Sequence, residues 1–145
     1  MKEVMGSVEI DAPVAQVWEA VMDFATYSEW NPFMVEMSGE LKVGSVYDAV
    51  TRVPGRKDMR FPSKVTEMKQ HDRLVLRGTQ IKGLFWTDHS FNFEQVGPNK
   101  TKFCQNIVFK GILVPFAGGR IKDVQKGLDQ MNEALKARCE VQIAT

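Results

Sequence analysis

Six consecutive segments between residues 33 and 114 alternate apolar and polar side chains with the period of a β-strand. Short turn signals separate them, among them KVG, PGRKD, KQHD, IKG and VGPNK. Connections this short join antiparallel neighbours, because parallel pairing needs a crossover of a dozen residues or more. The pattern therefore predicts a meander of antiparallel strands over residues 33–40, 45–53, 59–68, 74–80, 84–96 and 101–114.

The last part of the chain has a different period. Over residues 115–141 apolar side chains recur at spacings of three and four, with Lys, Asp, Glu and Gln on the opposite side. This pattern predicts one long amphipathic helix. Its apolar stripe consists of Val124, Leu128, Met131, Leu135 and Cys139.

The N-terminal part adds a strand and two short helices. Residues 4–10 alternate like a strand that ends at Asp11, and DAPVAQVWEAVMDF then has the composition of a helix with Pro13 in its first turn. A second short helix is predicted over residues 25–30. Pro32 ends it, because proline lacks an amide donor and disfavours helical geometry in the residue before it.

These elements predict a single α+β domain over residues 1–145. A chain of 145 residues, 43% of them hydrophobic, is long enough to bury one substantial core. We expect a seven-stranded antiparallel sheet curled around the long C-terminal helix, with the two short helices between strands 1 and 2. An enclosed space forms wherever sheet and helix do not meet.

Charge, cysteine content and missing motifs exclude several classes of function. With 19 Lys and Arg against 18 Asp and Glu, the chain has no strong field for nucleic acid. No apolar run approaches the roughly 18 residues of a membrane span, so we expect a cytoplasmic protein. Cys104 and Cys139 lack zinc-site spacing, and no G-x-G-x-x-G, P-loop, H-E-x-x-H or G-x-S-x-G occurs. We expect no metal and no cofactor; the oligomeric state stays open, a homodimer included.

Strand parity predicts which side chains face the helix, since successive residues point to opposite faces. The phenylalanines mark the inner face of the last two strands, and the same rule assigns the earlier ones. The predicted inner residues are Tyr47, Ala49, Thr51, Phe61, Ser63, Val65, Leu74, Leu76, Phe85, Thr87, His89, Phe91, Phe93, Phe103, Gln105, Ile107 and Phe109.

His89 and Gln105 are polar residues on faces otherwise filled with phenylalanine. A buried polar group without a partner costs about 1–3 kcal/mol, so each needs a hydrogen bond. One interpretation is a core histidine bonded to Gln105 or Tyr47. The other is a polar group that faces a ligand in an apolar pocket. Asp88 points to the opposite face and cannot orient His89.

Three further stretches are candidates for the border of a cavity. In YSEWNPFM, Trp30 and Phe33 flank the bend at Pro32, which is either a plain turn or the place where a cavity opens. Gly127 in the long helix leaves room for a cavity or adds flexibility. The segment RVPGRKDMR, with Arg56 at its centre, is either a solvated hairpin tip or a contact for an anionic group or a partner at the cavity mouth.

The chain resembles the START-like superfamily of helix-grip proteins, which includes lipid-transfer START domains, the birch-pollen allergen family and polyketide cyclase/dehydrase-like proteins. The last group is the most similar. Three motifs carry the resemblance: I-x-A-P-x-x-x-V-W at the first helix, an aromatic residue followed by W and P, and a glycine with apolar residues before the last helix. They correspond to Ile10, Ala12, Pro13, Val17 and Trp18, to Tyr27, Trp30 and Pro32, and to Gly111, Ile112 and Leu113.

This resemblance implies a helix-grip fold over the whole chain and a cavity that binds hydrophobic ligands such as lipids, hormones or polyketides. Some members are cyclases or dehydratases, and others are co-chaperones. We therefore predict a binding protein, a carrier or sensor, for a hydrophobic or aromatic small molecule. The alternatives are a cyclase or dehydratase with His89 as acid or base, and a chaperone-associated interaction protein. The candidate ligand-binding residues are Trp30, Phe33, Phe61, Leu76, Phe85, His89, Phe91, Gln105, Ile107, Val124, Leu128 and Met131.

Overall fold

Seven strands, three α-helices and two short 3₁₀ turns make up the part of the chain that the computed structural model describes, residues 2–39 and 41–144. The 3₁₀ turns are Phe24–Thr26 and Val114–Phe116. The strands and helices are β1 (Lys2–Ile10), α1 (Val14–Met22), α2 (Tyr27–Trp30), β2 (Met34–Ser38), β3 (Val46–Thr51), β4 (Met59–Lys69), β5 (Arg73–Ile81), β6 (Phe85–Gly97), β7 (Lys100–Lys110) and α3 (Gly118–Ala144).

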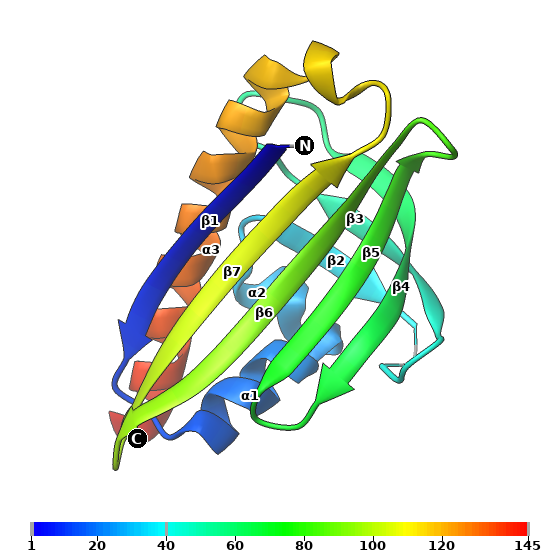
Figure 1. Cartoon of the computed structure of the whole chain (residues 1–145). Coiled ribbons are helices and arrows are strands. Elements are labelled where there is room, and N and C mark those ends of the chain that lie inside the picture. The colour runs from blue at the N-terminus through cyan, green and yellow to red at the C-terminus, as the bar shows by residue number, and fades with distance from the viewer. Residues whose placement is uncertain (1, 40, 145) are drawn as a thin grey trace.

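The strands form one antiparallel sheet in the order β1-β7-β6-β5-β4-β3-β2. Strands β2 to β7 follow one another as a meander, and β1 pairs with β7 in the register Gly6 opposite Gln105. Figure 1 shows the twisted sheet with α3 behind β1 and β7, and with α1 and α2 at one end. The predicted α+β class and the seven-stranded antiparallel meander are confirmed, and the structure adds the pairing of β1 with β7.

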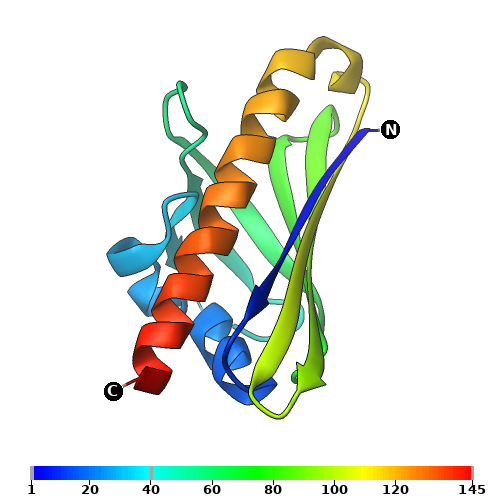
Figure 2. The same ribbon diagram turned by 90° about the vertical axis from the view of Figure 1, so that its left-hand side faces the viewer.

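Helix α3 lies along the concave side of the curled sheet (Figure 2). Its closest approach is to β1 at Gly6, where an added Cβ would lie 2.8 Å from Cδ2 of Leu128. The absent side chain at Gly6 therefore lets the helix pack tightly against this edge of the sheet. The opposite half of the sheet curves away from the helix, as the same figure shows.

Two predicted boundaries at the start of α3 were wrong. The strand predicted over residues 101–114 ends at Lys110, and the helix predicted from residue 115 begins at Gly118. Gly111 has φ +111°, which is incompatible with an extended strand, and the amide of Leu113 then donates to the carbonyl of Leu84. The chain turns there before the helix starts.

Two smaller differences lie near the N-terminus. Pro13 precedes the first turn of α1 as its N-cap residue, with φ −64° and ψ 151°, rather than lying inside the turn. The helix predicted over residues 25–30 is a 3₁₀ turn followed by the single turn of α2. It ends at Trp30, before Pro32, as predicted.

Strand parity is confirmed by the burial of the inner face. On β6, Phe85, Thr87, His89, Phe91 and Phe93 are all buried, and the alternate residues of β7 follow the same rule. The apolar side chains among them join the apolar stripe of α3 in one core. What parity does not decide is where along this face the side chains meet the helix.

Candidate ligand-binding cavity

A cavity of about 570 Å³ lies between the concave face of the sheet and the first half of α3. This volume falls within the range of about 300–1,000 Å³ that is typical of small-molecule sites. Most of its lining is apolar and comes from β3 to β7, the segment before α3, and the first turns of α3. The lining residues are Phe33, Met34, Ala49, Thr51, Val53, Arg56, Met59, Phe61, Ser63, Leu76, Gly78, Gln80, Ile81, Phe85, Thr87, His89, Ile107, Phe109, Leu113, Phe116, Ala117, Gly119, Arg120 and Val124.

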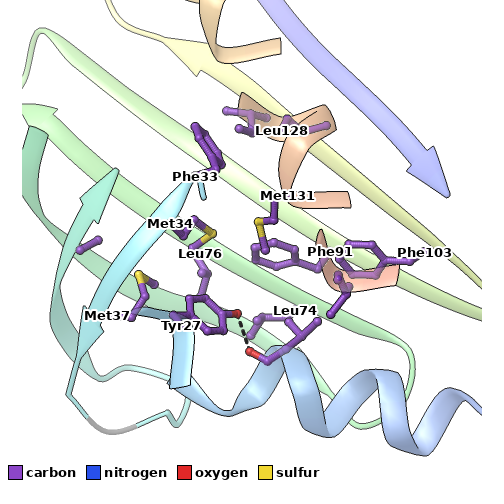
Figure 3. Packing of buried hydrophobic residues seen from close by; sticks show 14 of the residues in the cluster. Tyr27, Phe33, Met34, Met37, Leu74, Leu76, Phe91, Phe103, Leu128 and Met131 are labelled. Atoms are coloured by element: carbon purple, nitrogen blue, oxygen red, sulfur yellow. Dashed lines mark hydrogen bonds between the residues drawn. The ribbon is translucent and has the colours of Figure 1, made fainter. Parts of the chain in front are cut away.

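Phe33 separates this cavity from the solid part of the core. Its ring occupies the space that a side chain at position 127 would need: an added Cβ at Gly127 would lie 2.6 Å from Cδ1 of Phe33. Beyond it, Phe91, Leu128 and Met131 are fully buried between α3 and the sheet (Figure 3). Gly127 therefore accommodates an aromatic ring and does not open the cavity itself.

A second glycine shapes the wall in the same way. A Cβ at Gly78 on β5 would lie 2.6 Å from Cε2 of Phe61, so the Phe61 ring occupies the space that a side chain at position 78 would need. Both residues line the cavity. The aromatic ring takes the place of the missing side chain.

His89 lies at the closed end of the cavity, where the residue is only 8% exposed. Nε2 of His89 lies 2.7 Å from Oε1 of Gln105, and Nε2 of Gln105 donates to Oδ1 of Asn132 on α3 over 2.7 Å. Gln105 and Asn132 are also buried. The three side chains form a continuous polar relay from the cavity to the helix, with Gln105 as the partner that one interpretation of the sequence predicted.

Burial lowers the pKa of His89 to about 4, although the hydrogen bond with Gln105 works in the opposite direction. The imidazole is therefore neutral near pH 7. Asp88 lies on the outer face of the sheet, as predicted, where it pairs with Arg77 and Lys110. It gives His89 neither orientation nor charge.

Two more polar groups line the middle of the cavity. Nε2 of Gln80 donates to Oγ1 of Thr87 over 3.1 Å. Oε1 of Gln80 is buried and has no hydrogen-bond partner within residues 2–39 and 41–144. A buried carbonyl oxygen without a partner is costly, so a ligand or a water that donates to it is favoured.

The mouth of the cavity lies near the N-terminal end of α3, where lining residues become exposed. Phe116 is 85% exposed and Ile81 is 47% exposed. Arg56 and Arg120 border the same opening. An apolar rim with two guanidinium groups is suited to the entry of an apolar molecule that carries an anionic or polar end.

An ion pair crosses this mouth. Nε of Arg56, in the β3–β4 connection, lies 2.9 Å from Oδ2 of Asp123 on α3. Arg52 in the same connection pairs instead with its neighbour Asp58 over 2.9 Å. Of the two interpretations of the RVPGRKDMR segment, the position of Arg56 favours the cavity mouth, whereas Arg52 belongs to a solvated hairpin.

The structure brings seven of the twelve candidate ligand-binding residues together around the cavity. The other five lie in or beside the solid core or, for Gln105, behind His89 in the relay. The lining residues are Phe33, Phe61, Leu76, Phe85, His89, Ile107 and Val124, and those outside the lining are Trp30, Phe91, Gln105, Leu128 and Met131.

Trp30 is half-buried beside Tyr27, with ring centroids 5.3 Å apart and the rings nearly perpendicular. Its Nε1 is buried without a hydrogen-bond partner among the described residues. Of the two aromatic residues at the bend, Phe33 reaches the cavity and Trp30 packs at the end of the domain.

Some cavity residues were missed although the sequence contained a signal for them. Ser63, Thr87 and Phe109 share the predicted inner face. Asn132 follows Leu128 by four residues and so lies on the apolar stripe of the helix. Of the rim residues, Arg56 was a candidate for the cavity mouth, whereas Ile81, Phe116 and Arg120 had no such signal, because they lie at or beyond the ends of the predicted strands and helix, where position depends on the folded chain.

Metal-binding clusters and membrane-spanning helices are absent from the described ranges. No group of three or more His, Cys, Asp or Glu side chains there could hold a metal ion. No helix in the same part of the chain is both long and apolar enough to cross a bilayer. Cys104 and Cys139 are free thiols.

Residues 1–140 match the model of the family described as polyketide cyclase / dehydrase and lipid transport. The chain belongs to this family. The match spans the sheet, the cavity and nearly all of α3, and this family and fold fit a domain that binds hydrophobic ligands.

Solved structures with the same fold include proteins of several kinds. A START superfamily protein from Mycobacterium smegmatis is 19% identical, with a TM-score of 0.79 over 97% of this chain and 98% of that chain. The Zhui aromatase/cyclase from Streptomyces sp. R1128 is 14% identical, with a TM-score of 0.73 over 98% and 95%. Norcoclaurine synthase from Thalictrum flavum is 13% identical, with a TM-score of 0.71 over 94% and 84%. At these identities the likeness shows the fold alone. Among curated proteins, none matches the chain significantly in sequence.

Proposed function

We propose that this protein binds a hydrophobic or aromatic small molecule in the cavity between the sheet and α3, as a carrier or sensor. The observation that carries the proposal is the cavity itself, about 570 Å³, largely apolar, closed at His89 and open beside Phe116. The residues that line an empty apolar cavity lack the packing contacts that they would make in a filled core. A ligand of matching volume restores those contacts and stabilises the folded chain.

Catalysis by His89 is the alternative, and the surroundings of this residue weigh against it. With its pKa near 4, His89 carries no extra proton to donate at neutral pH and is a weak base. Its hydrogen-bond partner is the neutral amide of Gln105 rather than a carboxylate. An imidazole in this setting is better suited to recognising a ligand than to transferring a proton.

The binding proposal is tested in two steps. Native mass spectrometry of the purified protein reveals any molecule that co-purifies, and titration calorimetry with alkyl- and aryl-containing compounds measures affinity directly. We expect saturable binding with 1:1 stoichiometry. Absence of a retained molecule, together with no heat of binding across the panel, would contradict the proposal.

A turnover assay separates the carrier from the enzyme. The compounds that bind are incubated with the protein, and the products are analysed by mass spectrometry. A binding protein returns them unchanged. Turnover that disappears in a His89→Gln variant which still binds the compound would establish the enzyme instead.

A further inference from the structure

The relay that ends at His89 has a defined direction. Nε2 of Gln105 donates to Oδ1 of Asn132, so Oε1 of Gln105 faces His89 as an acceptor. The amide donor of Gln105 thus points toward α3 and away from His89.

Because Oε1 of Gln105 can only accept, Nε2 of the neutral His89 carries the ring proton and donates it. The other ring nitrogen, Nδ1, then carries a lone pair. No group in residues 2–39 or 41–144 hydrogen-bonds to Nδ1, and the ring lines the cavity beside Phe33, at a centroid distance of 6.4 Å. The closed end of the cavity therefore presents a hydrogen-bond acceptor in apolar surroundings.

We propose that the ligand carries a neutral hydroxyl or N–H group at its buried end, which donates to Nδ1 of His89. This inference rests on the proposed function and adds the ligand's chemical class: an alcohol, a phenol or an N–H heterocycle. A carboxylate is disfavoured at this end, because it would bring a charge into an apolar site and set its lone pairs against that of Nδ1. The buried acceptor on Gln80, further along the wall, has the same preference for a donor.

Three naphthalene probes test the inference by calorimetry. 2-Naphthol has the donor, 2-methylnaphthalene has nearly the same shape without it, and 2-naphthoic acid is anionic near neutral pH. We expect 2-naphthol to bind at least about tenfold more tightly than 2-methylnaphthalene, because only the phenol donates to the buried acceptor. The carboxylate of 2-naphthoic acid has the guanidinium groups at the mouth as alternative partners, so this compound shows whether an anionic end is accepted there. The hydrocarbon is the more hydrophobic compound, so a preference for the phenol cannot arise from burial of apolar area alone.

The variant His89→Phe keeps an aromatic ring and removes the acceptor. In this variant the preference for 2-naphthol over 2-methylnaphthalene should disappear or reverse. The substitution also leaves Gln105 without its donor and so lowers stability. A second measurement is therefore made on a protein that keeps His89.

That measurement is ¹⁵N NMR of the imidazole in a His71→Asn variant, in which His89 is the one remaining histidine. Asparagine tolerates the positive φ of 62° at position 71. We expect the ligand-free protein to show the tautomer with the proton on Nε2. The Nδ1 resonance should move toward that of a hydrogen-bonded nitrogen with 2-naphthol, and not with 2-methylnaphthalene. This also distinguishes a bond to His89 from one to Gln80.

The outcomes separate this inference from the proposed function. Equal binding of 2-naphthol and 2-methylnaphthalene, or a proton on Nδ1, would overturn the inference and leave the binding function standing. Failure of all three probes to bind would count against the binding of aromatic molecules in this cavity, and the inference would fall with it.

Discussion

The ring of Phe33 fills the space left by the missing side chain of Gly127: a Cβ added there would lie 2.6 Å from Cδ1 of the ring. Gly127→Ala should therefore destabilise the protein by about 1–3 kcal/mol, although alanine in a helix interior is normally favoured over glycine by up to about 1 kcal/mol. Urea denaturation measures the change. Gly119→Ala on the same helix is the control, since its Cβ would make an ordinary 3.4 Å contact with Arg56. Equal stabilisation of both variants would contradict the packing of Phe33.

Two residues one turn apart on α3 lie on either side of the boundary between the cavity and the packed core. Val124 lines the cavity, whereas Leu128 is fully buried against Gly6. Val124→Phe should leave the free energy of unfolding within about 1 kcal/mol of the wild type and weaken ligand binding, because the ring occupies part of an existing void. Leu128→Phe should cost about 1–3 kcal/mol through overpacking. Urea denaturation and calorimetry on both proteins test this, and a reversed order of the two stability losses would refute the assigned position of the cavity.

Stability should depend on pH through His89. Its pKa falls from 6.5 to about 4 on folding, so the unfolded chain binds more protons between these values. The contribution of this residue is fully present above pH 6.5 and is lost as pH falls from 6.5 to 4, by an amount of about 3 kcal/mol at most.

The measurement is urea denaturation of wild type and His89→Phe at a series of pH values. Carboxylates contribute equally to both proteins, so the difference between the two curves isolates His89. The curves should converge as pH falls through this window. A constant difference from pH 7 to pH 4 would mean that His89 is not buried as a neutral group.

The ion pair between Arg56 and Asp123 should control entry to the cavity more than stability. Asp123→Asn removes the bridge between the β3–β4 connection and α3. Exposed pairs contribute only about 0–1 kcal/mol, so the free energy of unfolding should change little. Stopped-flow measurements should show faster association and faster dissociation of a bound ligand, with a small change in Kd.

Asp58→Asn is the matched control, because the Arg52–Asp58 pair lies within the same connection and does not reach the helix. It should leave both rate constants unchanged. If the two variants behave alike, the contact across the mouth has no part in ligand exchange.

The sequence by itself determined the order of elements and the face on which each strand residue lies. Alternation placed His89 and Gln105 among inward phenylalanines, because side-chain direction in a strand is a local property with period two. The need of a buried polar group for a partner then made Gln105 one of two candidate partners for His89 within the chain, and the structure contains this bond. The stripe of α3 followed from the helical period in the same way.

Only the tertiary structure decided which part of the interior is hollow. His89 and Phe91 share one strand and one face, yet the first lines the cavity and the second lies in solid core. The difference depends on how closely α3 approaches the sheet, which is set at Gly6 and Gly127 by contacts with residues about a hundred positions away in the chain. No local sequence pattern predicts the distance between α3 and the sheet, because it depends on contacts between side chains that come together only after the sheet has curled.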